Sequence, residues 1–362
     1  MSIDRALVDA ALAAVTDPNT GRPFAAAKGV KSVAVDGTAV RAEIVLGYPA
    51  KSQLDALRAS IEAALRQVPG VERAEVTLTQ SIVAHAVQRG VKLLPNVKNI
   101  VAVASGKGGV GKSTTAVNLA LALASEGASV GVLDADIYGP SIPMMLGIEG
   151  RPDSPDGQTM NPLEGHGVQA NSIGFLVEQD NPMVWRGPMV TSALEQLLRQ
   201  TNWRELDYLV VDMPPGTGDI QLTLAQRVPV TGAVIVTTPQ DIALIDAKKG
   251  LKMFEKVGVP ILGIVENMSI HVCSNCGHAE HIFGAGGAER MAGEYGVQVL
   301  GSLPLDISIR EQADSGHPSV VADPSGRIAE TYRAIARKVA IQIAERARDM
   351  TGKFPSIVVQ NT

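Results

Sequence analysis

A glycine-rich segment constrains the fold of this chain more than any other feature. Residues 100–114 read Ile-Val-Ala-Val-Ala-Ser-Gly-Lys-Gly-Gly-Val-Gly-Lys-Ser-Thr, an apolar run followed by glycines and then by residues that suit a helix start. Residues 106–113 satisfy the pattern G-x-x-x-x-G-K-[ST] of a phosphate-binding loop. Such a loop joins a buried strand to a helix whose N-terminus faces the phosphate. The segment therefore predicts an α/β fold with a nucleotide site.

The residues of this loop have distinct expected roles. Glycines let backbone N–H groups curl around phosphates without a Cβ in the way, and the helix N-terminus adds partial positive charge. Lys112 should reach the β- and γ-phosphates, and the Ser113 hydroxyl should ligate Mg²⁺. A glycine-rich turn that matches by chance is disfavoured by the strand and helix around it. The expected nucleotide-binding residues are Gly106, Lys107, Gly108, Gly109, Val110, Gly111, Lys112, Ser113 and Thr114.

From Val97 onward, strands alternate with helices, which is typical of a parallel sheet covered by helices. Several of the expected strands are continuous apolar runs, as strands buried on both faces should be. Aromatic residues make up 3% of the chain, so the core must consist of Val, Ile, Leu and Ala. The Gly- and Pro-rich segments 147–167 and 181–188 are expected to be surface loops. The expected strands are residues 100–104, 130–133, 208–211, 233–237, 261–265 and 297–300.

A smaller α+β unit is expected to precede this domain. Its predicted order is α-β-β-α-β: a helix ending before the breaker segment 17–23, two strands around Asp36-Gly37, a second helix and a final strand. The predicted organisation is a small domain over residues 1–87, a linker over 88–96, the nucleotide-binding domain over 97–350 and a tail over 351–362.

Lys107, directly after the first glycine of the loop, resembles the signature lysine of the deviant P-loop family that includes the MinD and ParA ATPases. In that family this lysine reaches across a dimer interface to the partner's phosphates. The resemblance implies a P-loop NTPase with a mostly parallel sheet flanked by helices. It also implies a homodimer that closes on ATP.

Other landmarks of that family follow in order. Residues 134–141, Asp-Ala-Asp-Ile-Tyr-Gly-Pro-Ser, are similar to a switch I segment, with Asp136 placed to orient the attacking water. Asp212 ends an apolar strand as a Walker B aspartate does, and it would hold Mg²⁺ through water. The resemblance makes four residues the expected catalytic set: Lys107, Lys112, Asp136 and Asp212.

Asn267 and Pro304 match positions that frame adenine in the same relatives, which favours ATP over GTP. Each of these assignments has a purely structural alternative: Asp134 could cap a helix, Asp212 could be a strand-end carboxylate, and Asn267 could be a turn residue. Their order behind the glycine loop favours the functional reading, because phosphoryl transfer to water requires positioning and charge neutralisation.

The chain has two cysteines, Cys273 and Cys276. They cannot form a disulfide framework, and in a reducing compartment their spacing points to metal or redox chemistry. A [4Fe–4S] cluster takes four thiolates, so one chain owns half of the ligands. A two-fold dimer supplies the other half, because it places equal loops face to face. The pair therefore predicts a [4Fe–4S] cluster that bridges two subunits.

Three other uses of the cysteines remain open. Cys273, Cys276, His278 and His281 could bind zinc within one chain, although the His-x-x-His spacing is tighter than in the usual finger. A zinc ion held by four thiolates of two chains is geometrically equal to the bridging cluster. A thioredoxin-like redox pair is disfavoured, because Gly277 follows where a helix should begin.

Together these motifs resemble those of the Mrp/ApbC-type iron–sulfur cluster carriers, over about residues 97–343. Asp17-Pro-Asn-Thr-Gly21 makes the N-terminal unit similar to the small SufT-like domain found on bacterial members. The resemblance implies an ATPase that transfers a cluster to apo iron–sulfur proteins and works with cluster-assembly factors. Two departures are visible: Cys-Ser-Asn-Cys lacks the proline often found after the first cysteine, and the N-terminal unit has no cysteine, so its role with a cluster must be indirect.

The alternative class is a MinD/ParA-like positioning ATPase with a structural zinc site. MinD-like proteins bind membrane through a C-terminal amphipathic helix, and this chain has an apolar stripe at helical spacing: Ile328, Tyr332, Ile335, Val339 and Ile343. We expect this helix to pack on the sheet instead, because the segment 353–359 follows it.

Several classes of partner are disfavoured by the sequence. The net charge of −5 gives no field that would gather nucleic acid. No apolar run reaches the about 18 residues of a membrane span, and the N-terminus lacks the pattern of a secretory signal. We therefore expect a cytoplasmic protein with no nucleic-acid and no membrane partner.

Overall fold

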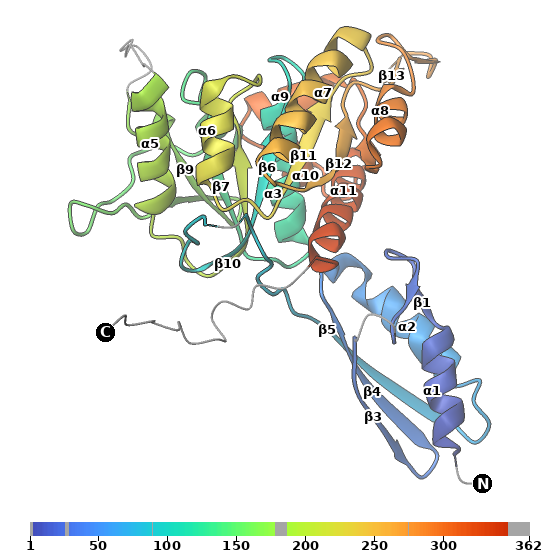
Figure 1. Cartoon of the computed structure of the whole chain (residues 1–362). Coiled ribbons are helices and arrows are strands. Elements are labelled where there is room, and N and C mark those ends of the chain that lie inside the picture. Colours follow the sequence, from blue (N-terminus) through green and yellow to red (C-terminus); the bar gives the residue numbers. More distant parts are fainter. Residues whose placement is uncertain (1–2, 26–28, 89, 178–186, 274, 347–362) are drawn as a thin grey trace.

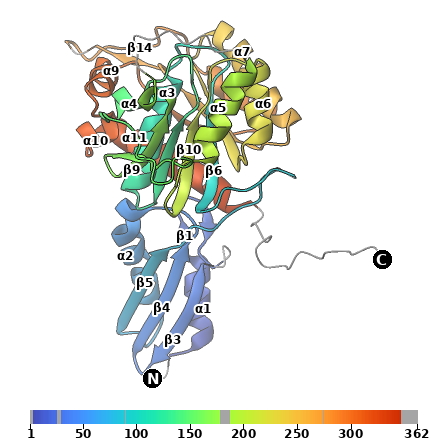
Figure 2. The ribbon, with the colours of Figure 1, turned by 90° about the vertical axis from the view of Figure 1, so that its left-hand side faces the viewer.

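The computed structural model describes residues 3–25, 29–88, 90–177, 187–273 and 275–346. Figures 1 and 2 show two units: a small N-terminal sheet with its helices, and a large sheet with helices on both faces. This is the fold class that the sequence predicts. The predicted tail 351–362 and the last residues of the predicted 97–350 domain lie outside the described residues, as do residues 181–186 of one predicted loop.

Among the described residues, the large sheet has eight strands in the order β15-β12-β11-β6-β10-β7-β9-β8. Neighbouring strands are parallel except at the edge, where β8 is antiparallel to β9. All six strands expected from the sequence are present. The strands are β6 (Val97–Ala104), β7 (Val130–Asp134), β8 (Leu163–Gly165), β9 (Val168–Ser172), β10 (Leu206–Asp212), β11 (Gly232–Thr237), β12 (Ile261–Glu266) and β15 (Val299–Ser302).

Strands β8 and β9 differ from the sequence-based expectation. β8 falls inside the segment 147–167 that was expected to be a surface loop, so that expectation is wrong for its last residues. β9 was not expected at all, because its sequence Val-Gln-Ala-Asn-Ser is half polar. All five of its residues are nevertheless buried, since Asn171 donates to the Thr201 hydroxyl and Ser172 donates to Asp134. Paired polar groups can be buried where unpaired ones cannot.

Alternating residues of the central strands face two separate cores. Val101 and Val103 of β6 pack against one group of helices, whereas Ile100 and Ala102 pack against the other. The first face is covered by α3 (Lys112–Ser125), α10 (Ser319–Ala322) and α11 (Arg327–Ala344), and the second by α5 (Gly187–Arg199), α6 (Asp219–Arg227), α7 (Asp241–Lys256) and α8 (Gly287–Tyr295). Two short helices, α4 (Ile142–Met145) and α9 (Ile307–Asp314), lie near the carboxyl ends of the strands.

The apolar stripe of α11 packs inside the molecule. Tyr332, Ile335, Val339 and Ile343 are at most 1% exposed, and Figure 1 shows the helix running beside the large sheet. The expectation that this helix packs on the sheet is confirmed. Within the part of the chain that the structure describes, no helix is both long and apolar enough to cross a membrane.

The N-terminal unit has the predicted order, with one short hairpin added. Its three-stranded sheet β3-β4-β5 has an antiparallel β3–β4 pair around Gly37 and a parallel β4–β5 pair joined through α2. The segment expected to break the first helix forms β1 and β2. The elements are α1 (Arg5–Ala14), β1 (Thr16–Asp17), β2 (Arg22–Pro23), β3 (Val30–Asp36), β4 (Ala39–Leu46), α2 (Leu54–Leu65) and β5 (Arg73–Gln80).

A buried ion pair lies where the two units meet. Arg337 of α11 donates to Glu126, which follows α3, at 2.5 Å, and their side chains are 6% and 0% exposed. Ser52 of the N-terminal unit donates to the same carboxylate through its backbone N–H at 2.9 Å and its hydroxyl at 2.6 Å. One carboxylate therefore joins both units.

Candidate nucleotide site and cysteine hairpin

The glycine loop lies between β6 and α3, as its sequence predicts. Gly109 and Gly111 have φ values of 80° and 82°, a left-handed conformation that glycine adopts without strain. Gly106 lies against α7, where a Cβ would come within 2.1 Å of the Asp246 carbonyl carbon. Lys107 is half-buried, and its carbonyl accepts a hydrogen bond from Ser105. The loop is therefore held by its own turns and by close contact with a neighbouring helix.

Lys112, Ser113 and two aspartates lie together at the carboxyl edge of the sheet. The Lys112 Nζ is 2.6 Å from Asp212 Oδ1, 3.1 Å from Ser113 Oγ and 3.9 Å from Asp136 Oδ2. Asp212 is fully buried, and its Oδ2 has no hydrogen-bond partner among the described residues. Burial raises the pKa of Asp212 while Lys112 opposes the rise. The structure thus brings four of the predicted residues to one point and leaves one buried carboxylate oxygen free to bind.

Asp134 holds the predicted switch I segment in place. Its Oδ2 accepts from the backbone N–H groups of Ser141 (3.1 Å) and Ile142 (3.2 Å) and from the Ser172 hydroxyl (3.0 Å), and its Oδ1 accepts from the Asp136 N–H (3.1 Å). Asp134 is not an N-cap residue, the structural alternative that the sequence allowed, because the N-cap of α4 is Ser141; Asp134 instead accepts from the first backbone N–H groups of α4 from the end of β7. Because both ends of the segment meet one carboxylate, Asp134 also fixes the backbone of Asp136.

The protonation of Asp134 is expected to make stability depend on pH. Asp134 is opposite Asp212 on adjacent parallel strands, and burial together with the Asp212 charge raises the pKa of Asp134 to about 7. The ordinary pKa of an aspartate is 3.8. At a pH between 3.8 and about 7, the folded protein therefore holds a proton on Asp134 that the unfolded chain has lost. This group's contribution to stability therefore falls as the pH rises toward 7.

Urea unfolding of the nucleotide-free protein between about pH 5 and about pH 8 would measure this effect. The wild type should lose more stability with rising pH than Asp134→Asn, with a difference in slope of up to about 1.4 kcal/mol per pH unit below pH 7. Asp134→Asn should be less stable overall, because its NH₂ group faces backbone N–H donors. Parallel curves for the two proteins would contradict the raised pKa.

Asn267 and Pro304 occupy different parts of the site. Asn267, which follows β12, is 9% exposed, and its Nδ2 donates to the Val110 carbonyl of the glycine loop at 2.9 Å. Pro304, which follows β15, lines a cavity of about 470 Å³ that Asn267 does not line. The adenine role predicted for both residues stays a prediction. The contact of Asn267 with the loop was not expected from the sequence.

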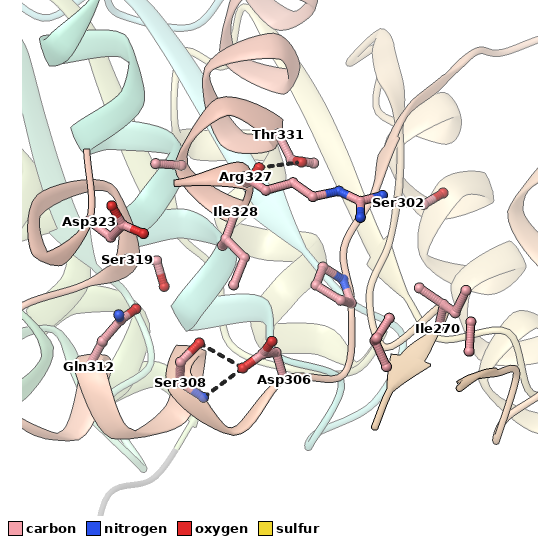
Figure 3. A pocket seen from close by; sticks show the side chains of 14 residues that line it. Ile270, Ser302, Asp306, Ser308, Gln312, Ser319, Asp323, Arg327, Ile328 and Thr331 are labelled. Atoms are coloured by element: carbon pink, nitrogen blue, oxygen red, sulfur yellow. Dashed lines mark hydrogen bonds between the residues drawn. The ribbon is translucent and has the colours of Figure 1, made fainter. Parts of the chain in front are cut away.

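Figure 3 shows this cavity, which has polar groups in its wall. Ser319 is 2% exposed, and its Oγ and the Gln312 Oε1 are buried without a hydrogen-bond partner among the described residues. Ile328 contributes an apolar wall, and one turn further along α11 Tyr332 contacts Thr115 in the first turn of α3. The cavity therefore lies beside the helix that carries the glycine loop and offers hydrogen bonds that the protein itself leaves unused.

Cys273 and Cys276 lie at the tip of a hairpin formed by β13 (His271–Val272) and β14 (Ala279–Glu280). The tip is closed by two backbone hydrogen bonds, from Cys273 N–H to His278 O and from Gly277 N–H to Cys273 O, both 2.9 Å. Cys273 is half-buried and Cys276 is exposed. The backbone N–H groups of Cys276 and Asn275 lower the pKa of the Cys273 thiol, which favours the thiolate that binds metal.

The structure does not assemble the single-chain zinc site that the sequence left open. Across the described ranges, no group of three or more His, Cys, Asp or Glu residues is placed to hold a metal ion. Instead, two histidine rings face backbone carbonyls: His271 Nδ1 is 3.1 Å from Leu305 O, and His281 Nδ1 is 2.6 Å from Ser269 O. Within the described ranges, the pair of thiols therefore has no further metal ligand beside it.

Comparison with known proteins decides the family. The family described as NUBPL iron-transfer P-loop NTPase matches residues 96–340, which is more than half of the chain. The chain belongs to this family. A second family, described as iron-sulfur cluster assembly protein, matches residues 5–78. The two matches confirm the resemblance of the nucleotide domain to iron–sulfur carriers and of the N-terminal unit to an assembly domain.

Relatives with similar sequences cover most of the chain. It is 55% identical over 354 residues to the iron-sulfur cluster carrier protein of Escherichia coli (strain K12), covering 97% of this chain and 95% of the relative. It is 62% identical over 278 residues to the iron-sulfur cluster carrier protein of Pseudomonas fragi, covering 76% and 97%.

Solved structures resemble the nucleotide domain of the chain. A nucleotide-binding protein from Archaeoglobus fulgidus in complex with ADP is 37% identical with a TM-score of 0.57, covering 66% of this chain and 93% of that chain. The cell division ATPase MinD from Pyrococcus furiosus is 23% identical with a TM-score of 0.50, covering 67% and 98%, a likeness that concerns the fold alone.

Proposed function

We propose that this chain is a cytoplasmic ATP-hydrolysing carrier that holds a [4Fe–4S] cluster between two copies of itself and transfers it to apo iron–sulfur proteins. The cysteine hairpin carries the proposal. Its two thiols are accessible at the tip, and a [4Fe–4S] cluster needs four thiolates, so a second copy must supply the rest. The names of the Escherichia coli and Pseudomonas fragi relatives support iron–sulfur cluster as the cargo.

The surface around the thiols suits a second copy. Val272 and Ile282 flank the cysteine pair in the sequence and are 46% and 50% exposed. Exposed apolar side chains beside a functional group are typical of a surface that another chain covers. In a two-fold dimer the same hairpin of each subunit would meet at the axis, which brings Cys273 and Cys276 of both copies together.

The phosphate site fits a nucleotide with Mg²⁺. Lys112 is paired with Asp212 at 2.6 Å, and arriving β- and γ-phosphates would draw the ammonium away from that carboxylate. The buried, unpartnered Asp212 Oδ2 would then bind a water of the metal, and Ser113 Oγ would ligate the metal directly. Bound Mg²⁺ would neutralise charge on the phosphate oxygens.

The remaining residues would position the reactants. Asp136, whose backbone is fixed by Asp134, would orient the attacking water, and Lys107 would reach the phosphates of the partner subunit. The adenine would enter the cavity lined by Pro304 and Ile328, where the Ser319 hydroxyl offers an unused hydrogen bond. Closure of the dimer on ATP would change how the cysteine hairpins face each other, and hydrolysis would be coupled to cluster loading or release.

Anaerobic reconstitution with iron and sulfide tests the proposal. The wild type should become brown and bind about two irons per chain, which is one four-iron cluster for two chains. Cys273→Ser and Cys276→Ser should each lose the visible absorbance and the transfer of iron to an apo iron–sulfur protein. His278→Ala is the control and should keep both, because its exposed side chain makes no hydrogen bond in the described residues. A colourless protein with stoichiometric zinc would overturn the proposal.

A further inference from the structure

The cysteine hairpin is held at its base by hydrogen bonds of two side chains, one before and one after the cysteines. On the incoming arm, His271 Nδ1 lies 3.1 Å from Leu305 O, and the Leu305 N–H donates to Ile270 O at 2.8 Å. On the outgoing arm, His281 Nδ1 lies 2.6 Å from Ser269 O. A carbonyl oxygen only accepts, so each Nδ1 carries the proton and donates. The two histidines thereby tie the hairpin to the ends of β12 and β15.

The carbonyl that His281 contacts belongs to a short segment that also contacts the glycine loop. Ser269 is two residues after Asn267, whose Nδ2 donates to Val110 O at 2.9 Å. Asn267 also touches the loop sterically, because a Cβ at Gly111 would come within 2.1 Å of that same Nδ2. Any shift of the loop on phosphate binding must therefore move Asn267 or break this bond.

Ser269 has little freedom to absorb such a shift. It is 7% exposed, its N–H donates to Leu303 O at 2.9 Å, and its hydroxyl donates to the same oxygen at 3.0 Å. A displacement that begins at Val110 would consequently pass through a short, hydrogen-bonded segment to the carbonyl that holds His281. Energetic coupling is carried by contiguous contacts of this kind where they have two arrangements.

We propose that His281 is a positioning residue that couples the cysteine hairpin to the nucleotide-bound state of the glycine loop. The inference deepens the proposed carrier function and rests on it. Its rival is direct ligation, because a metal-bound histidine also commonly donates its other ring N–H to a carbonyl. The two roles make different predictions for metal-free protein. If His281 positions the hairpin, its removal changes the reactivity of the metal-free thiols, whereas removal of a residue that acts only as a ligand does not.

The composition of the chain allows a direct test on metal-free protein. Cys273 and Cys276 are its two cysteines, so the reaction of a disulfide reagent such as Ellman's reagent reports on the hairpin tip alone. The rate would be measured in chelator at one fixed pH, without nucleotide and with saturating Mg²⁺ and a non-hydrolysable ATP analogue. His278→Ala is the matched control, since His278 is an exposed histidine of the same hairpin without a side-chain hydrogen bond in the described residues.

The expected result has two parts. Without nucleotide, the half-buried Cys273 thiol should react about two- to tenfold faster in His281→Ala than in the wild type, because loss of one hydrogen bond at the base of the hairpin lets this thiol become exposed more often. The nucleotide should change the wild-type rate and leave the His281→Ala rate unchanged. His278→Ala should follow the wild type, and His281→Asn, whose amide can donate to the same carbonyl, should restore part of the nucleotide effect.

Other outcomes would overturn the inference. One is a wild-type thiol reaction rate that is the same with and without nucleotide. The other is a His281→Ala protein whose rates equal those of His278→Ala. If circular dichroism shows that His281→Ala does not fold, the comparison rests on His281→Asn. Nucleotide must then change the thiol reaction rate of His281→Asn by less than it changes the wild-type rate. The carrier function is judged separately by reconstitution, so failure of the coupling leaves that result standing.

Discussion

Arg337→Ala should lower the free energy of unfolding by about 3–5 kcal/mol, because it leaves a buried carboxylate without its counter-charge. Glu126 is 0% exposed, and Arg337 supplies the cation at 2.5 Å. The hydrogen bonds from Ser52 would remain, but they carry no full charge. For a domain of this size the melting temperature should fall by about 6–20 °C.

Thermal and urea unfolding measure this effect, with Arg310→Ala as the control. Arg310 is 62% exposed and pairs with Glu311 and Asp314, so its removal should change stability by less than about 1 kcal/mol. The double variant Arg337→Met with Glu126→Gln should recover part of the loss, because the neutral amide removes the unpaired buried charge while its carbonyl oxygen can still accept a hydrogen bond from Ser52. Equal effects of Arg337→Ala and Arg310→Ala would contradict the structure at this junction.

Gly106→Ala should abolish ATP hydrolysis and weaken nucleotide binding by about a hundredfold. The added Cβ would come within 2.2 Å of the Asp246 carbonyl oxygen and 2.5 Å of the Ala247 nitrogen. These are backbone atoms of α7 that cannot move aside as a side chain could. The glycine loop must therefore shift by about an ångström, and a misplacement of that size in a positioned site has an effect of about this magnitude.

Titration with a fluorescent ADP analogue and a phosphate-release assay would measure both effects. Gly293→Ala is the control, because a Cβ there meets nothing within 4 Å. Gly293 lies inside α8, so alanine should leave nucleotide binding unchanged and stabilise the fold by up to about 1 kcal/mol. Normal hydrolysis by Gly106→Ala would show that the loop does not pack on α7 in this way.

Much of the fold could be predicted from the sequence, because short segments of the chain carry the signals for their own strands, turns and helices. The strand, loop and helix at residues 97–125 are encoded by an apolar run, glycines where φ is positive, and a helix start. The pair Lys112 and Asp212 was also predictable, because parallel strands bring their carboxyl ends to one edge. β9 escaped prediction because its polar residues are buried through partners far along the chain.

The contacts that sequence could not reveal join distant residues. Glu126 and Arg337 are 211 positions apart, and nothing in either local sequence marks a buried pair. The same holds for the bond from Asn267 to Val110, which spans 157 positions. The contact of His281 with Ser269 O could not be predicted either, because the spacing of His281 to the cysteines is visible in the sequence whereas its distance to Ser269 O is a property of the fold.

Native mass spectrometry of the anaerobically reconstituted protein would show how many chains hold one cluster. Iron and sulfide should travel with the mass of two chains, as one four-iron cluster held by Cys273 and Cys276 of each copy, and a separated chain should carry none. A single chain that retains the complete cluster would contradict the proposed bridging cluster.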